Sequence, residues 1–248
     1  MYNYKEVDDI LVAGSTKFLR NDSIAACDLW LEAWEKIKQI MDTESLIDIN
    51  DVDDLYNWCE LMGNFVQDLE HELYNAGIDE PLYYSKKIIF CQEVLKRTKD
   101  ENLIKEMRRA IAETRFSLGE QEEASKDFES IIQDFPNWSW SYLDWANCHV
   151  ILTKPPNYDK AIPLLERALE NVDAEGFSDI CEVAKGYFDN MDDELKTSSH
   201  AASLQHIAGL DKSIDFHPAK QNIREYSKNL AENEAYRTRV NLERKGAE

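Results

Sequence analysis

Residues 105–146 read KEMRRAIAETRFSLGEQEEASKDFESIIQDFPNWSWSYLDWA, and the spacing of their small and large side chains decides the fold. Ala112 and Ala146 lie 34 residues apart, each within a stretch that has apolar residues at helical spacing. A small side chain in the middle of one helix lets a second helix approach closely. Ala124 supplies the matching small contact, and Pro136 ends the unit. The stretch therefore predicts pairs of helices that recur along the chain.

A recurrence of about 34 residues is the period of tetratricopeptide repeats, which this chain resembles. Gly14, Ala26 and Ala33 reproduce the same internal spacing near the N-terminus. The resemblance implies an all-α fold, a right-handed superhelical stack of antiparallel helix hairpins, forming one α-solenoid domain over residues 1–248. The expected hairpins, and a terminal capping helix, cover residues 7–42, 52–98, 103–136, 138–172, 177–212 and 218–245.

A narrower resemblance is to a group of bacterial tetratricopeptide-type proteins. Members of that group often carry a small zinc motif of the kind found at the C-terminus of the SecA translocase ATPase. The stretches that carry the likeness are residues 107–113, 118–120, 135–148 and the Trp-rich 27–34. The zinc motif itself is absent from this sequence. The resemblance therefore implies no cofactor and no metal.

Composition and charge narrow the class of protein. Eight Gly and six Pro in 248 residues are few, which favours helices. The net charge of −21 repels nucleic acid phosphates and anionic lipids, so we expect neither nucleic acid nor membrane as a partner. No apolar run approaches the ~18 residues that span a bilayer, and the N-terminus lacks a signal core. These features predict a cytoplasmic protein.

Cysteine and tryptophan are expected to serve packing. The cysteines are odd in number, lack C-x-x-C spacing and all fall within expected helices, which predicts reduced core thiols at Cys27, Cys59, Cys91, Cys148 and Cys181. Rings buried between hairpins are expected at Trp30, Trp34, Trp58, Trp138 and Trp145. The acidic run 48–54 is interpreted as the N-terminal cap of the helix that carries Trp58.

The sequence contains no motif that assigns a catalytic residue. It has no glycine-rich phosphate loop, no G-x-S-x-G elbow and no H-E-x-x-H pair. His149 shares a helix face with the packing residues Tyr142 and Trp145, so a hydrogen-bonded core histidine is expected there. We therefore expect no enzyme, and an enzyme with an unrecognised site is the least favoured class.

Trp140 lies off the packing stripe and shares a helix face with Leu143 and Asn147. In tetratricopeptide stacks the corresponding face lines the concave surface. The equivalent positions of the neighbouring hairpins are Arg109, Glu113, Phe116 and Lys185. Asparagine can pair with a peptide backbone, Arg or Lys with a carboxylate, and the rings with an apolar anchor. This face is therefore the predicted partner-binding site.

The match to the carboxylate clamp of chaperone-binding tetratricopeptide proteins is partial, because Glu113 stands where the clamp has an amide. The alternative is that Arg109 simply pairs with Glu106 or Glu113 one turn away.

The sequence favours a non-catalytic module that binds a protein or peptide on the concave face. A second hypothesis is a peptide-responsive signalling regulator with a mobile basic C-terminal helix, since residues 218–248 hold seven Lys or Arg against five Glu. The oligomeric state, monomer or homodimer, stays open.

Overall fold

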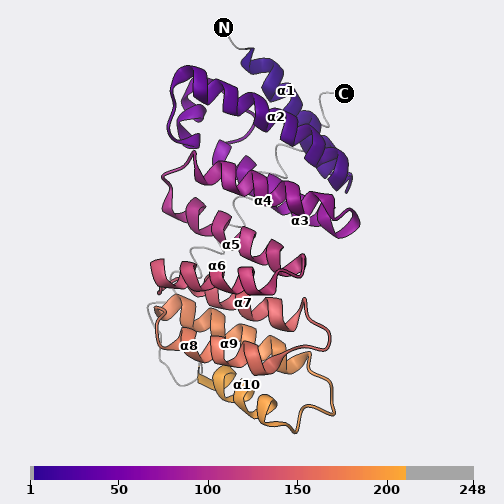
Figure 1. Cartoon of the computed structure of the whole chain (residues 1–248), viewed down its shortest axis with the longest axis vertical. Helices are drawn as coiled ribbons and strands as arrows, with labels where there is room; N and C mark the ends of the chain where they lie inside the picture. The colour runs from indigo at the N-terminus through magenta and orange to yellow at the C-terminus, as the bar shows by residue number, and fades with distance from the viewer. Residues whose placement is uncertain (1–2, 211–248) are drawn as a thin grey trace, which may run out of the picture. The chain divides into compact units, whose positions relative to one another are not determined.

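The computed structural model describes residues 3–210, and within this range the regular structure is helical, with no strand. Turns and some longer loops, such as residues 190–198 between α9 and α10, separate consecutive helices (Figure 1). The α-helices and the 3-10 helix η1 are α1 Tyr4–Phe18, α2 Ser23–Glu44, η1 Ile49–Leu55, α3 Met62–Asp79, α4 Leu82–Leu95, α5 Glu101–Ser117, α6 Gln121–Asp134, α7 Ser139–Val150, α8 Tyr158–Leu169, α9 Ala174–Asp189 and α10 Ser199–Leu210. The predicted all-α class is therefore confirmed.

Short polar side chains fix the starts of several helices. Asp22, Asp100 and Asn157 each accept a hydrogen bond from a backbone N–H in the first turn of α2, α5 and α8. Asp173 accepts one from the Gly176 N–H at the start of α9, at 3.0 Å. Such caps satisfy a backbone donor that has no partner within the helix.

The described chain forms two compact units. The first comprises the described residues up to Phe135 together with Asn147–Pro156, and the second comprises Pro136–Ala146 and the described residues from Asn157 onward. In the first unit each helix from α1 to α5 packs against the next one, and α3 also contacts α5. In the second unit α8, α9 and α10 pack against one another.

Two tryptophans of α2 anchor the core of the first unit. Trp30 and Trp34 are buried, as expected. The Trp34 ring meets Phe90 edge-on at 5.3 Å between centroids, and the Trp30 ring meets Phe65 at 6.3 Å. The Trp34 Nε1–H donates to the Glu93 carboxylate at 2.9 Å. Large rings with satisfied N–H groups contribute much of the apolar burial of this unit.

Glycine permits close helix approach at two places in the first unit. A Cβ added at Gly14 would lie 2.3 Å from the Trp30 ring, and one at Gly77 would lie 2.4 Å from the Tyr84 ring. The absence of a side chain is therefore what lets α1 meet α2, and α3 meet α4, at these points.

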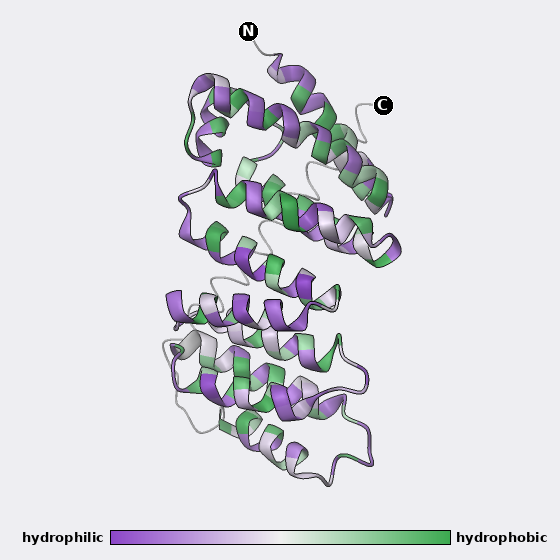
Figure 2. Cartoon of the chain, viewed as in Figure 1, coloured by the Kyte–Doolittle hydropathy of each residue, from purple (hydrophilic) through white to green (hydrophobic). Residues whose placement is uncertain are grey.

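The second unit has a core of its own. Tyr142, Leu165 and Leu204 are buried in it. The Arg167 guanidinium lies over the Tyr142 ring at 5.8 Å from its centroid, a cation–π contact. Most helices of both units carry hydrophobic and hydrophilic residues along their length (Figure 2), as expected for helices with one buried face.

The segment around Trp58 corrects two expectations. Residues 49–55 of the acidic run form the separate 3-10 helix η1, which Asp48 and Asp51 cap reciprocally. Trp58 follows η1 outside any helix, is half-buried, and donates its Nε1–H to the Val52 carbonyl at 2.8 Å. Helix α3 begins only at Met62, whose N–H donates to the Asp53 carboxylate at 2.9 Å. The carboxylates thus hold a connecting segment in place instead of capping a helix that carries Trp58.

The expectation that the cysteine and tryptophan side chains are buried in the core is confirmed only in part. Cys27, Cys91, Cys148 and Cys181 are buried and free, but Cys59 is exposed and lies outside the helices. It was expected in the core because Trp58 and its neighbours were expected to be helical. The rings of Trp138 and Trp145 belong to residues that are only partly buried.

Among the helices between residues 3 and 210, none combines the length and the apolar character needed to cross a lipid bilayer. The expected capping helix at 218–245 lies outside the described residues, as do the last two residues of the expected hairpin 177–212.

Candidate functional site

The residues predicted to bind a partner belong to different units. Arg109, Glu113, Phe116 and Asn147 lie in the first unit, whereas Trp140, Leu143 and Lys185 lie in the second. Trp140 has 46% of its surface exposed, and Lys185 is exposed as well. Arg109, Glu113 and Asn147 are half-buried.

The prediction that Leu143 and Phe116 contact a partner is wrong. Leu143 has no exposed surface and Phe116 is buried, so neither offers area to a ligand. The Phe116 ring packs edge-on against the His149 ring, with centroids 5.1 Å apart and planes at 86°. His149 is itself buried, as expected. These side chains serve packing, because the helix face that carries them is covered.

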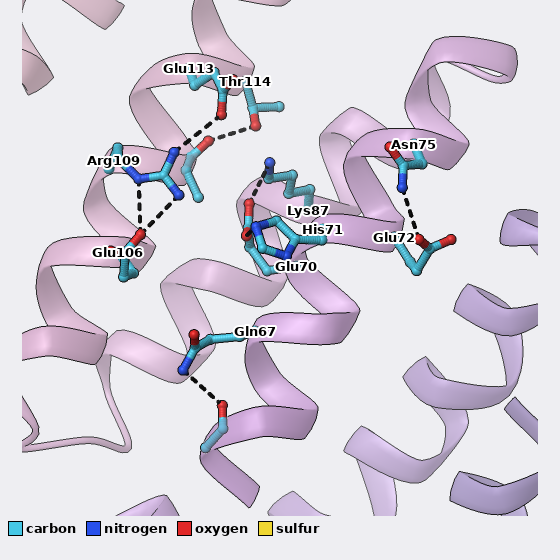
Figure 3. Close-up of polar contacts among 12 residues, drawn as sticks. Gln67, Glu70, His71, Glu72, Asn75, Lys87, Glu106, Arg109, Glu113 and Thr114 are labelled. Atoms are coloured by element: carbon cyan, nitrogen blue, oxygen red, sulfur yellow. Dashed lines mark hydrogen bonds and ion pairs between the residues drawn. The ribbon is translucent and has the colours of Figure 1, made fainter. Parts of the chain in front are cut away.

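Arg109 makes the local pairs that were named as the alternative to peptide binding. Its guanidinium contacts Glu106 at 2.8 Å, one turn before it, and Glu113 at 3.7 Å, one turn after it. Figure 3 shows the guanidinium between the two carboxylates. Pairs at these helical spacings lie on the same face of α5.

Arg109 and Glu113 also line a cavity of about 500 Å³ in the first unit. The other lining residues come from the end of α1 and from α3 and α4, and they are Phe18, Asp68, Glu70, His71, Glu72, Tyr74, Asn75 and Lys87. This cavity is the candidate site, because it gathers charged and aromatic side chains from four helices. It contains two of the seven predicted residues.

A buried ion pair forms part of the cavity wall. The Lys87 Nζ lies 2.5 Å from the Glu70 carboxylate, and only 1% and 4% of the two side chains are exposed. Burial raises the pKa of Glu70, but the charges of Lys87 and Arg109 outweigh that effect and hold the pKa below its ordinary value of 4.5. The Glu70 carboxylate is therefore charged near neutral pH, and Figure 3 shows Lys87 directed at it.

Tyr74 joins the ion pair to the aromatic part of the wall. The Lys87 ammonium lies 4.5 Å from the centroid of the Tyr74 ring, and the Tyr84 ring lies 5.5 Å away. The Tyr74 hydroxyl is 3.4 Å from the Ser117 hydroxyl on α5. These three contacts restrict the position of the Tyr74 side chain.

Glu72 is a buried acid of the cavity wall that has a neutral hydrogen-bond partner. Only 5% of it is exposed, and its Oε1 accepts a hydrogen bond from the Asn75 amide at 2.8 Å. Within residues 3–210 it forms no ion pair, and its Oε2 has no hydrogen-bond partner. The full lining holds four carboxylates against Lys87 and Arg109, a formal charge of −2 with His71 neutral.

A metal site does not emerge from these side chains. Among the described residues no three His, Cys, Asp or Glu side chains are grouped so that they could hold a metal ion.

Sequence reasoning missed Glu70, Lys87 and Tyr74. One signal was available: Lys87 stands on the stripe of α4 that also carries Tyr83, Phe90 and Val94, all buried. A lysine at a core position is unusual unless it is paired. Its partner Glu70, 17 positions earlier on another helix, could not be read from local spacing.

Neither a protein-family model nor a curated protein sequence matches the chain.

Proposed function

We propose that the chain is a non-catalytic protein-interaction module of tetratricopeptide-like architecture. Its five helix pairs would stack as hairpins, and a polypeptide segment would bind in the cavity to which α1, α3, α4 and α5 contribute. The observation that carries this function is the convergence of fixed charges and aromatic rings from these helices on one open cavity of about 500 Å³.

The buried ion pair of Lys87 and Glu70 is better explained by a role in ligand binding than by a contribution to folding stability alone. Taking two charges out of water is expensive, and well-packed apolar residues of the same volume often stabilise a fold as much or more. At a cavity, however, such a pair presents polar groups whose positions are fixed before a ligand arrives. Tyr74 and Arg109 are held in the same way by contacts within the first unit.

The direction of the pKa shifts argues against catalysis in this cavity. A general acid or base works best with a pKa near the working pH. The pKa of Glu70 moves down from 4.5, whereas burial moves the pKa of Tyr74 up from 10.0. Both shifts lead away from neutrality, so these two groups keep one protonation state. This supports a binding role and disfavours the enzyme hypothesis.

Selection from a random peptide library against the full chain tests the function. Peptides that bind the parent protein are measured again on Asn75→Trp, which adds bulk to an exposed position of the cavity wall. Asn64→Trp makes the same change at an exposed position of α3 outside the lining and serves as the matched control. We expect the first variant to weaken binding by about tenfold or more and the control to retain it. Peptides that bind both variants equally, or no binding peptides at all, would contradict the proposal.

A further inference from the structure

We infer that the occupant of the cavity is a basic amphipathic segment, with a Lys or Arg side chain in the cavity and apolar side chains against its rim. This inference rests on the proposed function and names the chemistry of its ligand. It differs from the carboxylate partner that the sequence pattern assigned to Arg109.

The cations of the cavity are already neutralised by the chain itself. Lys87 pairs with Glu70 at 2.5 Å, and Arg109 pairs with Glu106 at 2.8 Å and with Glu113 at 3.7 Å. An incoming carboxylate would have to displace these acids and would meet the net negative charge of the lining. Anionic ligands are therefore disfavoured by charge.

Glu72 gives an incoming cation a specific partner. The residue is 5% exposed, and its only hydrogen bond within residues 3–210 comes from the neutral Asn75 amide. A buried carboxylate without a cation gains more from an ion pair than an exposed one does. The Tyr74 and Phe18 side chains in the same lining can cover the methylene groups of a Lys or Arg side chain.

Exposed apolar side chains stand next to this acidic cavity. Phe18 lines it, and its neighbour Leu19 has 70% of its surface exposed. Ile78, with 65% exposed, lies three residues beyond the lining residue Asn75 on α3, which places it one helical turn away. An acidic cavity with an apolar rim is complementary to a segment that carries basic residues on one face and apolar ones on the other.

The test uses the full chain and three fluorescently labelled peptides. Two are amphipathic helical designs of about 18 residues, the first with Lys on one face and Leu on the other and the second with Glu in place of Lys. The third peptide has the sequence of residues 218–245 of this chain. We expect micromolar binding of the Lys peptide and binding of the Glu peptide weaker by about tenfold or more.

Two pairs of variants localise the effect. Glu72→Gln removes the buried charge, and Glu32→Gln removes one exposed charge on α2 outside the lining. Asn75→Arg and Asn64→Arg place a new cation inside and outside the cavity at exposed positions, so they keep the test valid if Glu72→Gln does not fold. The Lys peptide should bind about tenfold more weakly to Glu72→Gln and Asn75→Arg only.

Equal losses with Glu32→Gln and Glu72→Gln would overturn the inference, because binding would then be general attraction to an acidic protein. If the 218–245 peptide binds more tightly than the Lys peptide, with the same dependence on Glu72, the inference of an external partner would be overturned. The occupant of the cavity would then be the chain's own segment. Library peptides that bind the cavity but lack basic residues would refute the charge inference and leave the interaction module intact. The absence of any cavity-dependent peptide would overturn both.

Discussion

The Lys87 ammonium and the Glu70 carboxylate lie 2.5 Å apart, almost completely buried, and join α4 to α3 at the wall of the cavity. On α4, Lys87 occupies a place among buried apolar residues, so its charge is tolerated only because Glu70 compensates it. The pair therefore links the stability of the first unit to the geometry of the proposed binding site.

Removing one member of this pair should destabilise the protein far more than removing both. Lys87→Met keeps the length of the side chain but leaves Glu70 buried without its ion-pair partner, so we expect a loss of about 3–5 kcal/mol in the free energy of unfolding. Lys87→Met combined with Glu70→Leu should recover most of that loss. Urea unfolding of the parent and the two variants measures both values. A double variant as unstable as Lys87→Met would show that the apolar replacement cannot pack there.

Stability should fall on the acid side of the ordinary glutamate pKa. The folded-state pKa values of Glu70 and Glu93 are lowered from 4.5; burial opposes the shift, whereas cation pairing with Lys87 and Lys38 drives it. A lowered folded pKa contributes stability that is fully present above 4.5 and is lost as the pH falls through the folded value. Chemical denaturation at several pH values measures the slope. In Glu70→Gln the slope below pH 4.5 should decrease, by at most about 1.4 kcal/mol per pH unit. An unchanged slope would rule out a contribution from Glu70.

Adding one methyl group should have opposite effects at two helical glycines. At Gly14 of α1 a Cβ would lie 2.3 Å from the Trp30 ring, whereas at Gly186 of α9 nothing lies within 4 Å of it. Gly14→Ala should therefore destabilise the protein by about 1–3 kcal/mol through overpacking. Gly186→Ala should stabilise it by about 0.5–1 kcal/mol, because alanine favours helices. Thermal and urea unfolding compare the two variants with the parent. A stabilising Gly14→Ala would mean that Trp30 can move aside easily.

Most helices could be predicted, because the sequence features that indicate a helix lie within the helix itself. The 34-residue spacing of Ala112 and Ala146 and the apolar periodicity around them mark α5 and α7 without any knowledge of tertiary contacts. The prediction was wrong around Trp58 for the same reason. No local sequence signal distinguishes an acidic helix cap from the separate 3-10 helix that this acidic run forms. The observed arrangement depends on hydrogen bonds between residues further apart, such as the one from the Met62 N–H to the Asp53 carboxylate, nine positions earlier.

The candidate site was predicted only in part, because burial is a tertiary property. Helical spacing correctly placed Arg109 and Glu113 together on one face, yet it also assigned Phe116 to an open surface that the His149 ring covers. Glu70 and Lys87 matter as a buried ion pair, and neither residue alone indicates the site. No sequence pattern links two such residues on neighbouring helices. A lysine within an apolar stripe was the one signal that pointed to such a pair.

Cys59 should react slowly for an exposed cysteine. The residue as a whole is exposed, but partial burial of the thiol group, together with the neighbouring Asp8 carboxylate, raises its pKa to about 12. Because the thiolate is the nucleophile, alkylation at about pH 8 should be on the order of a hundredfold slower than that of a free small-molecule thiol. The four other cysteines are buried and should be modified only on unfolding. Mass spectrometry of the labelled protein over time measures each site separately.

Replacing Asp8 should reverse this protection. The Asp8 Oδ1 accepts a hydrogen bond from the Cys59 backbone N–H at 2.6 Å, and its charge opposes formation of the thiolate. Asp8→Asn should lower the pKa of Cys59 and speed alkylation about fivefold or more, with the pH–rate profile moved to lower pH. Asp9→Asn changes the neighbouring exposed acid, which pairs with Lys5, and is the matched control. A faster rate without a shift of the profile would point to loosening of the segment around Cys59 and would exclude an electrostatic effect of Asp8.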